Sequence, residues 1–318
     1  MRAVVLREFG GPEVLEWSEV PDPSPPPGWV VVQLRAAAMN WHDVIARRGN
    51  VAGMELPRII GSDGAGVRRD TGEPVFILPS LFWGAEERHP GAEFEILGDF
   101  TDGTYAELVA VPEENVFPLP SGWDWPEAAA LPLAGVTAYR ALFSRGGLQT
   151  GETAVILGAG SGVSTMAISL ATMAGARVLV TSSSQEKIER AVELGASGGA
   201  LYTDEGWAEQ LEKADLVVDS VGSTWPDSLS VLKPGGRLVV FGATGGDQAT
   251  IDVRPFYFGQ FSILGTTMGS PRDFARLLGM LDPRWRPAVE AVMPLDDVAA
   301  AHARMQRRDH FGKLVLVP

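Results

Sequence analysis

The chain has 318 residues, and at about 150 residues per domain this length predicts roughly two domains. Hydrophobic residues make up 45% and charged residues 21%, which is typical of a folded globular protein and excludes a largely disordered chain. The 26 basic and 40 acidic residues give a net charge of −14, and no basic run offsets it, so a nucleic-acid partner is not expected. The absence of cysteine excludes disulfides, thiolate zinc sites, iron–sulfur clusters and a cysteine nucleophile, and it favours a cytoplasmic location.

One uncharged segment, from Thr153 to Ala176, is long enough to cross a bilayer. It contains clustered glycines and several hydroxyl side chains, which fit a buried strand, a glycine turn and a buried helix better than a membrane span. The apolar run at the start of the chain, Ala3–Leu6, is too short for a secretory signal. We therefore expect neither a membrane segment nor a signal peptide.

The first third of the chain is predicted to be rich in β-structure. Residues 2–6 and 29–34 are short β-branched runs separated by the proline-rich turn at 21–28. Residues 82–102 have little periodicity and are expected to form an irregular loop, which in a compact domain is typical of a functional segment.

From about residue 123 the pattern changes to alternating strands and helices. Strands are expected at 154–157, 178–181, 216–218 and 237–241, and helices at 165–173, 185–194 and 228–232. Such alternation predicts a parallel sheet covered on both faces. A final strand at 313–317 is expected to return to the β-rich part, so that the chain crosses the domain boundary twice.

The turn Gly158-Ala159-Gly160-Ser161-Gly162-Val163 lies between the first of these strands and the first helix. In a dinucleotide-binding fold, such glycines allow a tight turn and let backbone N–H groups approach a pyrophosphate at the helix N-terminus. Glycines also serve a purely steric turn, but the strand, helix and second strand around them favour dinucleotide binding. The usual third glycine is Ser164 here, so the packing of helix on strand must accept a hydroxymethyl group.

The end of the second strand decides which dinucleotide is expected. Enzymes that use NAD place an acidic residue there to bind the ribose 2′-hydroxyl, but this chain has Thr181-Ser182-Ser183-Ser184. Hydroxyl groups with Lys187 one helical turn further on suit a 2′-phosphate, which favours NADPH over NADH. The alternative is that the serines only cap the helix and Lys187 is solvated.

Further motifs follow one another in a fixed order along nearly the whole chain. They are residues 1–4 with 9–15, 56–67, 102–107, 128–132, 135–139, 233–237 and 312–316. With these motifs the chain resembles the medium-chain dehydrogenase/reductase superfamily, and specifically its zinc-free, quinone-oxidoreductase-like branch.

The resemblance implies an α/β fold with a Rossmann doubly wound parallel sheet and a β-rich GroES-like domain. The GroES-like substrate domain would span residues 1–121 and be completed by 267–318, the Rossmann NAD(P)-binding domain would span 122–266, and the active site would lie in the cleft between them. It also implies hydride transfer from NAD(P)H, with a set of residues around the nicotinamide: Thr137, Val221, Gly222, Phe241, Gly242 and Ala243. Lys187 and Tyr202 match positions that face the adenosine phosphate in relatives that use NADPH, although Tyr202 is equally compatible with an ordinary strand-end aromatic.

The positions that match the catalytic zinc ligands of related alcohol dehydrogenases are Asn40, Ser62 and Leu133. Leucine cannot bind a metal, and an Asn/Ser pair is a poor site for zinc. The loop at 82–102 has no cysteine for a structural zinc either, so no zinc is expected.

Without a Lewis acid, oxidation of a plain alcohol is difficult, whereas a quinone or α,β-unsaturated carbonyl accepts hydride and needs only hydrogen-bond donors and a proton. The candidate catalytic residues are Asn40, His42 and Asp43: Asn40 to bind substrate oxygen or the nicotinamide ribose, His42 to supply or relay a proton, and Asp43 to orient His42. The alternative is that Asn40 and Asp43 satisfy backbone groups around a tight turn and His42 only lines the cleft. The other histidines, His89, His302 and His310, lie in polar stretches and are expected to be solvated.

Four aromatic residues are candidates for an apolar substrate pocket, although each also suits the core: Trp41, Phe82, Trp83 and Tyr257. Two other functions compete with a quinone or enone reductase: an alcohol or aldehyde dehydrogenase of the same superfamily, and a non-catalytic NADPH-binding sensor. By the same resemblance, the apolar segment 262–267 is the expected edge strand of a homodimer.

Overall fold

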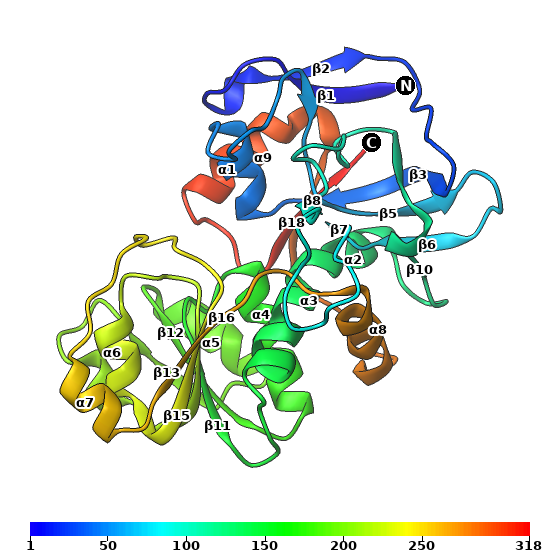
Figure 1. Cartoon of the computed structure of the whole chain (residues 1–318). Helices are drawn as coiled ribbons and strands as arrows, with labels where there is room; N and C mark the ends of the chain where they lie inside the picture. Colours follow the sequence, from blue (N-terminus) through cyan, green and yellow to red (C-terminus); the bar gives the residue numbers. More distant parts are fainter. The chain divides into compact units, whose positions relative to one another are not determined.

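The computed structural model describes all 318 residues, which divide into two compact units (Figure 1). Unit 1 comprises Met1–Ala134 and Ser270–Pro318, and unit 2 comprises Gly135–Gly269. The first division lies 13 residues after the expected boundary at 121, because helix α2 (Trp125–Ala130) packs against strands of unit 1. Helix α3 (Pro132–Tyr139) carries the chain across the division.

Unit 1 is built mainly from antiparallel strands. The largest sheet has the order β10-β6-β5-β3-β18-β17, with β9 paired to β3, and a smaller sheet has the order β2-β1-β4. The strands are β1 (Arg2–Leu6), β2 (Leu15–Glu19), β3 (Trp29–Ala38), β4 (Arg58–Ile59), β5 (Asp63–Arg68), β6 (Pro74–Ile77), β7 (Ser80–Leu81), β8 (Glu95–Ile96), β9 (Leu108–Pro112), β10 (Val116–Pro118), β17 (Val289–Pro294) and β18 (Lys313–Val317). The helices are α1 (Trp41–Arg47), α2, α8 (Pro271–Met280) and α9 (Val298–Gln306).

The last strand of the chain completes unit 1, as the sequence predicted. Strand β18 pairs antiparallel with the end of β3, where Val315 faces Ala38, and parallel with β17. The pairing places Lys313 beside the turn that follows β3. This turn leads directly into α1, which carries His42 and Asp43.

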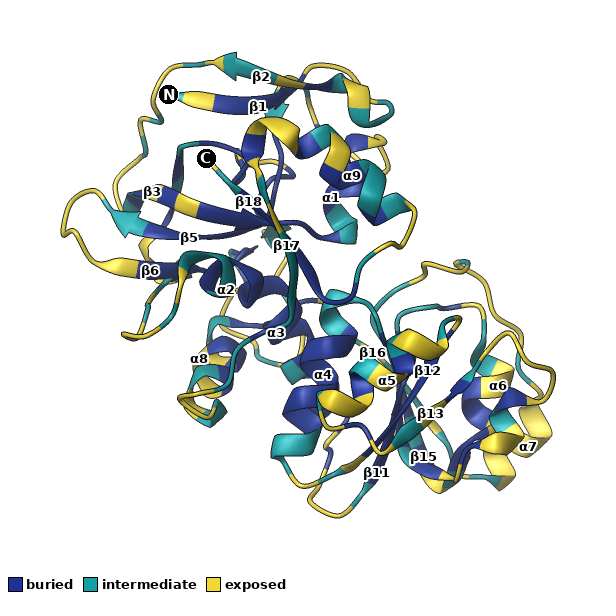
Figure 2. Cartoon of the chain, turned by 180° about the vertical axis from the view of Figure 1, so that it is seen from behind, coloured by how far each residue is buried: buried dark blue, intermediate teal, exposed yellow.

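Unit 2 is a single parallel sheet of six strands in the order β13-β12-β11-β14-β15-β16. Its strands are β11 (Thr153–Ile156), β12 (Arg177–Ser182), β13 (Gly198–Leu201), β14 (Ala214–Asp219), β15 (Leu232–Val240) and β16 (Ser262–Gly265). Helices α4 (Gly162–Met173), α5 (Gln185–Glu193), α6 (Trp225–Ser230) and α7 (Val253–Phe258) lie between them. Figures 1 and 2 show α4 on one side of the sheet and α6 and α7 on the other, and the inner strands β11, β12 and β14 are almost wholly buried. This is the doubly wound Rossmann arrangement expected from the alternating pattern.

Local signals in the sequence set the ends of the helices. The side chain of Ser184 accepts the backbone N–H of Lys187 and caps α5, and Gly195 follows the end of this helix with φ at +112°. No helix of the chain combines the length and the apolar character needed to cross a membrane.

Candidate functional site

The glycine turn of unit 2 joins β11 to α4 at the carboxyl edge of the parallel sheet. Gly158 has φ at +72°, a conformation that favours glycine, and the side chain of Ser161 caps α4 by accepting the N–H of Ser164. A Cβ added to Gly160 would lie 2.8 Å from Cδ and 3.1 Å from Nζ of Lys187. The lysine side chain therefore lies directly over the bare backbone of the turn and brings a positive charge to the N-terminus of α4, where phosphate groups bind in this fold.

Ser164 replaces the usual third glycine without a steric conflict. Its side chain is buried, its hydroxyl donates to the carbonyl of Leu157 at 2.9 Å, and the same oxygen lies 2.7 Å from the hydroxyl of Ser161. The hydroxymethyl group thus bonds to the strand that precedes the turn, so α4 remains closely packed on the sheet.

The serines after β12 have different roles. The hydroxyl of Ser182 accepts the N–H of Ser184, and Ser184 caps α5, so two of the three serines serve the local backbone. Ser183 is exposed and its hydroxyl makes no hydrogen bond within the chain. Tyr202, which is 41% exposed, donates its backbone N–H to the carbonyl of Ser182. Ser183 and Tyr202 therefore lie at the carboxyl ends of β12 and β13, and Lys187 lies on α5, the helix that follows β12.

The remaining cofactor candidates lie on loops at the same edge of the sheet or on α3. Asp219 ends β14, and one oxygen of its buried carboxylate accepts the N–H groups of Val221 at 2.6 Å and Gly222 at 3.1 Å. The other oxygen is buried and has no partner, and burial raises the pKa of this carboxyl despite the two backbone hydrogen bonds. Gly242, between Phe241 and Ala243, lies close to the backbone of Ser220. A Cβ added to Gly242 would lie 2.9 Å from the carbonyl oxygen of Ser220. Thr137 is buried on α3, with its hydroxyl 4.0 Å from the sulfur of Met268.

In unit 1, a buried polar cluster lies where β3, β5 and β18 meet. The ammonium of Lys313 donates to Oδ1 of Asn40 at 2.6 Å and to Oδ2 of Asp63 at 2.8 Å. The amide of Asn40 in turn donates to Oδ2 of Asp63 at 3.0 Å and to the carbonyl of Ala38 at 3.4 Å. Both ends of the Asn40 side chain are thus used within the chain, which favours a structural role for this residue over direct binding of substrate.

Asp43 is fully buried and also belongs to this cluster. Its carboxylate accepts the N–H of Asn40 at 2.8 Å, the hydroxyl of Tyr105 at 2.8 Å and the hydroxyl of Ser62 at 3.3 Å. Burial raises the pKa of Asp43 to about 6, although these hydrogen bonds and the charges of His42 and Lys313 lower it. Asp43 makes no hydrogen bond to His42, so the expectation that Asp43 orients the histidine is wrong.

The partner of His42 is Asp99, on the irregular loop. His42 Nε2 lies 2.8 Å from Asp99 Oδ1, and the aspartate is almost fully buried while the histidine side chain is 23% exposed. Burial disfavours a charged imidazole, but the hydrogen bond and the negative charge of Asp99, with the charge of Asp43, outweigh it, so the pKa of His42 is raised. Because the carboxylate can only accept, Nε2 carries a proton and Nδ1 remains free of any partner in the chain.

The three positions that match zinc ligands in related dehydrogenases are each engaged with other groups of the chain. Leu133 contributes only its backbone N–H, which donates to Oδ1 of Asp63 at 2.7 Å, while the Asn40 oxygen faces the Lys313 ammonium and the Ser62 hydroxyl bonds to Asp43. A buried ammonium beside a neutral amide is a poor surrounding for a dication. No group of three or more His, Cys, Asp or Glu side chains in the chain is placed to hold a metal ion.

The candidate pocket aromatics pack in separate surroundings. Trp41 packs against the core around α1, Phe82 lies 6.0 Å from Trp29 between ring centres, and Trp83 is buried in an edge-on contact with Phe94. Tyr257 lies on α7 of unit 2 beside the exposed Phe258. Trp41 and Phe82 therefore pack against different hydrophobic clusters of unit 1.

His302 is fully buried and not solvated as its polar neighbours suggested. Neither ring nitrogen has a hydrogen-bond partner, and burial, with the charge of Arg47, lowers the pKa of His302 to about 3. Arg47 is itself buried and donates to Oε1 of Gln306 at 3.1 Å, while its Nε and Nη1 have no partner. His302 is thus a neutral core residue below α1.

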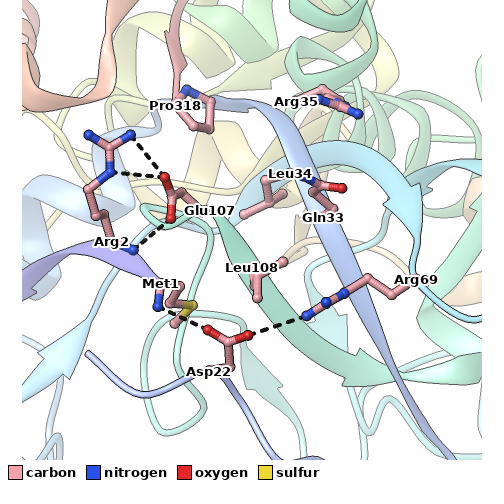
Figure 3. A pocket seen from close by; sticks show the side chains of 10 residues that line it. All are labelled: Met1, Arg2, Asp22, Gln33, Leu34, Arg35, Arg69, Glu107, Leu108 and Pro318. Carbon is pink, nitrogen blue, oxygen red and sulfur yellow. Dashed lines mark hydrogen bonds and ion pairs between the residues drawn. The ribbon is translucent and has the colours of Figure 1, made fainter. Parts of the chain in front are cut away.

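A polar surface hollow in unit 1 contains none of the predicted site residues (Figure 3). Arg2 pairs there with Glu107, and the amino group of Met1 and the guanidinium of Arg69 both pair with Asp22. These ion pairs are mostly exposed, and the hollow has no buried catalytic group.

Three functional candidates come from the structure and not from the sequence: Asp99, Lys313 and Asp219. Asp99 and Lys313 act on residues 57 and 273 positions away, respectively, so no local spacing reveals them. Asp219 had a local signal, because an acid at the carboxyl end of a central parallel strand lies at the edge where ligands bind in this fold.

Comparison with known proteins agrees with this architecture. Residues 26–121 match the family described as the alcohol dehydrogenase GroES-like domain, and residues 162–282 match the family described as zinc-binding dehydrogenase. A zinc-type alcohol dehydrogenase-like protein of Schizosaccharomyces pombe is 32% identical over 99% of this chain and 99% of its own length. Two solved structures superpose over all of both chains: an NAD-dependent alcohol dehydrogenase, with a TM-score of 0.92 and 38% identity, and the quinone oxidoreductase of Thermus thermophilus, studied also in complex with NADPH, with a TM-score of 0.84 and 31% identity. This chain therefore belongs to the medium-chain dehydrogenase/reductase superfamily of oxidoreductases.

Proposed function

We propose that this protein is a zinc-independent, NADPH-dependent oxidoreductase that transfers hydride to a quinone or an α,β-unsaturated carbonyl compound. The observation that carries the proposal is the pairing of His42 with Asp99. The pair supplies a polarised proton donor with a raised pKa, which is the group such a reduction needs in place of a metal ion.

The proposed reaction uses the cofactor residues of unit 2 and the proton donor of unit 1. When bound, the cofactor supplies a hydride. As a conjugated acceptor gains this hydride at carbon, its π electrons move onto the carbonyl oxygen, and protonated His42 gives the Nδ1 proton to that oxygen. Asp99 holds the ring by Nε2 and stabilises its charged form, and the histidine is recharged from solvent through its exposed edge.

Three side chains of unit 2 support NADPH as the reductant. Ser183 offers a free hydroxyl, Tyr202 an exposed phenol, and Lys187 a positive charge over the glycine turn. No acidic side chain ends β12, so the 2′-phosphate meets donors and no repelling carboxylate. One of the two related structures is named as an NAD-dependent enzyme, and the other is named for its complex with NADPH. The residues of this chain favour NADPH.

The proposed independence of zinc rests on what surrounds the corresponding positions. Leu133 has no donor atom, and Asn40 and Ser62 are already bonded to Lys313 and Asp43. The cluster carries its own cation, and a metal ion would have to displace a buried ammonium from its carboxylate.

The test is oxidation of NADPH by purified, metal-free protein, with 9,10-phenanthrenequinone, 1,4-benzoquinone and methyl vinyl ketone as acceptors and NADH as control. Turnover that survives a chelator and prefers NADPH is expected. Oxidation of primary alcohols with NADP that requires added zinc would instead identify an alcohol dehydrogenase. Tight NADPH binding with no turnover of any acceptor or alcohol would identify a sensor.

The proposal includes a homodimer formed through β16. This strand ends the parallel sheet, so one of its edges is unpaired within the chain, and its residues are only partly buried. Light scattering of the purified protein is expected to give twice the chain mass of 33.9 kDa.

A further inference from the structure

Phe100 is an exposed aromatic side chain next to the residue that holds the proposed proton donor. It follows Asp99, whose carboxylate is almost fully buried against His42, yet the Phe100 side chain is 44% exposed. The chain thus turns one side chain inward and the next one outward at this point. A large apolar ring left in water gains stability if a ligand covers it.

One edge of the ring lies beside the loop that follows α1. A Cβ added to Gly53 would lie 3.7 Å from Cε1 of Phe100, so the ring packs beside a position that has no side chain. Gly53 has φ at +81°, a conformation that other residues adopt only with strain. The ring therefore packs beside bare backbone at Gly53, and 44% of the residue stays exposed.

The placement of Phe100 is coupled to that of the proton donor. His42 lies on α1, the loop with Gly53 follows the same helix, and Asp99 bonds to the histidine at 2.8 Å. The donor and the aromatic surface are thus fixed to α1 by adjacent residues of one loop.

We propose that Phe100 is a specificity-determining residue that selects planar, multi-ring acceptors over small aliphatic ones. An acceptor such as a fused-ring quinone would stack in an offset arrangement on the exposed part of the Phe100 ring while its carbonyl oxygen bonds to His42. A short aliphatic enone has no π-surface to stack and loses nothing without Phe100. This inference rests on the proposed function, since it names the class of substrate for the same site.

The chain offers a matched control in Phe9. Phe9 is 43% exposed, almost the same fraction as Phe100, and it also lies over a glycine of the loop after α1, with its Cγ 2.8 Å from a Cβ added to Gly49. Phe9 follows β1, however, and is not adjacent to a residue that bonds to His42. If exposed aromatic area alone mattered, the two residues would be equivalent.

The experiment compares Phe100→Ala, Phe100→Leu, Phe100→Trp and Phe9→Ala by steady-state kinetics with 9,10-phenanthrenequinone, 1,4-benzoquinone and methyl vinyl ketone. For phenanthrenequinone, Phe100→Ala is expected to raise KM about 3- to 10-fold with little change in kcat. Phe100→Leu, which keeps the apolar volume, is expected to resemble Phe100→Ala, and Phe100→Trp to restore the low KM. The methyl vinyl ketone parameters should stay unchanged in every variant, and Phe9→Ala should resemble the unmodified protein throughout.

An equal rise in KM for all three acceptors, no rise for phenanthrenequinone, or the same effect from Phe9→Ala would overturn the proposal. If the unmodified protein reduces no acceptor, the proposed function fails, and the role of Phe100 is then decided by binding alone. Calorimetric titration of phenanthrenequinone is expected to show binding to the unmodified protein and to Phe9→Ala that is weakened in Phe100→Ala. Equal binding to all three proteins would reject Phe100 as a binding residue.

Discussion

The ammonium of Lys313 lies 2.8 Å from the carboxylate of Asp63, and both side chains are buried, at 2% and 0% exposure. Each charge of this buried ion pair compensates the other, because either charge alone would be buried without a partner, at a large cost in free energy. The same ammonium fixes the amide of Asn40, so the pair organises the polar cluster of unit 1.

Replacing Lys313 by methionine is expected to lower the free energy of unfolding by about 3–5 kcal/mol, because Asp63 would remain charged and buried. The double variant Lys313→Met with Asp63→Asn should recover much of this loss. Urea unfolding followed by circular dichroism measures both effects. The control is Lys233→Met, because Lys233 pairs with Asp215 at 2.7 Å but is 43% exposed, so its loss should cost no more than about 1 kcal/mol. Equal costs for the two lysines would contradict the buried-pair account.

The pH dependence of turnover is expected to follow His42. The raised pKa extends the protonated form of the imidazole to higher pH than in a free histidine, so kcat should fall as the pH rises through that pKa. Asp99→Asn removes the carboxylate that favours the charged ring and should shift this fall to lower pH, and His42→Ala should abolish it and reduce kcat about 100-fold or more. The exposed His89 on the same loop provides the control His89→Gln, which should leave the profile unchanged. If Asp99→Asn leaves the pH dependence of kcat unchanged, the His42–Asp99 pair has no part in the mechanism.

Asp43 is expected to make the protein less stable as the pH rises from about 4 to about 6. Its pKa in the folded state is about 6 and lies above the ordinary value, so folding favours the protonated acid and this contribution is lost as the carboxyl ionises. Asp43→Asn resembles the protonated form and should raise the free energy of unfolding at pH 8 by about 2–3 kcal/mol. Unfolding curves at pH 4.5 and 8 test this, and a variant less stable than the parent at pH 8 would show that the charged form is required.

His302, in contrast to Asp43, is expected to make the protein less stable as the pH falls. Its folded pKa of about 3 lies below the ordinary value near 6.5, so stability is fully present above pH 6.5 and is lost as the pH falls toward 3. His302→Leu removes a buried side chain without hydrogen bonds and should flatten this loss while changing stability at pH 7.5 by about 1 kcal/mol or less. Thermal unfolding between pH 3.5 and 7.5 decides the matter. Unchanged acid sensitivity in the variant would assign the effect to other groups.

The choice of cofactor is expected to depend on Ser183 and Lys187. Ser183→Asp places a carboxylate at the end of β12, where it repels a 2′-phosphate and accepts from a 2′-hydroxyl, so it should weaken NADPH binding about 10-fold or more and strengthen NADH binding. Lys187→Ala should weaken NADPH binding more than NADH binding. Fluorescence titration with both nucleotides measures the four affinities. If each substitution changed the affinities for NADPH and NADH by the same factor, Ser183 and Lys187 would not contact the 2′-phosphate.

Much of unit 2 could be predicted from sequence because its signals are local. The run of strands, the capping Ser184 and the glycine turn each specify a few neighbouring residues, and the structure follows them. His302 also had a usable signal, because residues 298, 301, 302 and 305 repeat at helical spacing and are the buried face of α9. Its polar neighbours hid that pattern.

The site of unit 1 could be predicted only in part. The position of His42 on a turn into a helix was readable, but its partner lies on a loop without periodicity. The engagement of Asn40 depends on which residue of the last strand faces the end of β3, and that register is decided by the whole sheet. Side chains that meet only through long-range contacts have no fixed spacing in the sequence, so no sequence motif reveals them.

The position of Lys313 has a consequence for biosynthesis. A ribosome makes Asn40, Asp43 and Asp63 early, and then the whole of unit 2, before it reaches β18. During that interval the nascent chain holds Asp63 without the ammonium that neutralises it in the finished fold. Unit 2 has all its strands by then, whereas unit 1 must wait for β18, so unit 1 completes its fold after unit 2. A chaperone that protects this protein would be expected to bind unit 1.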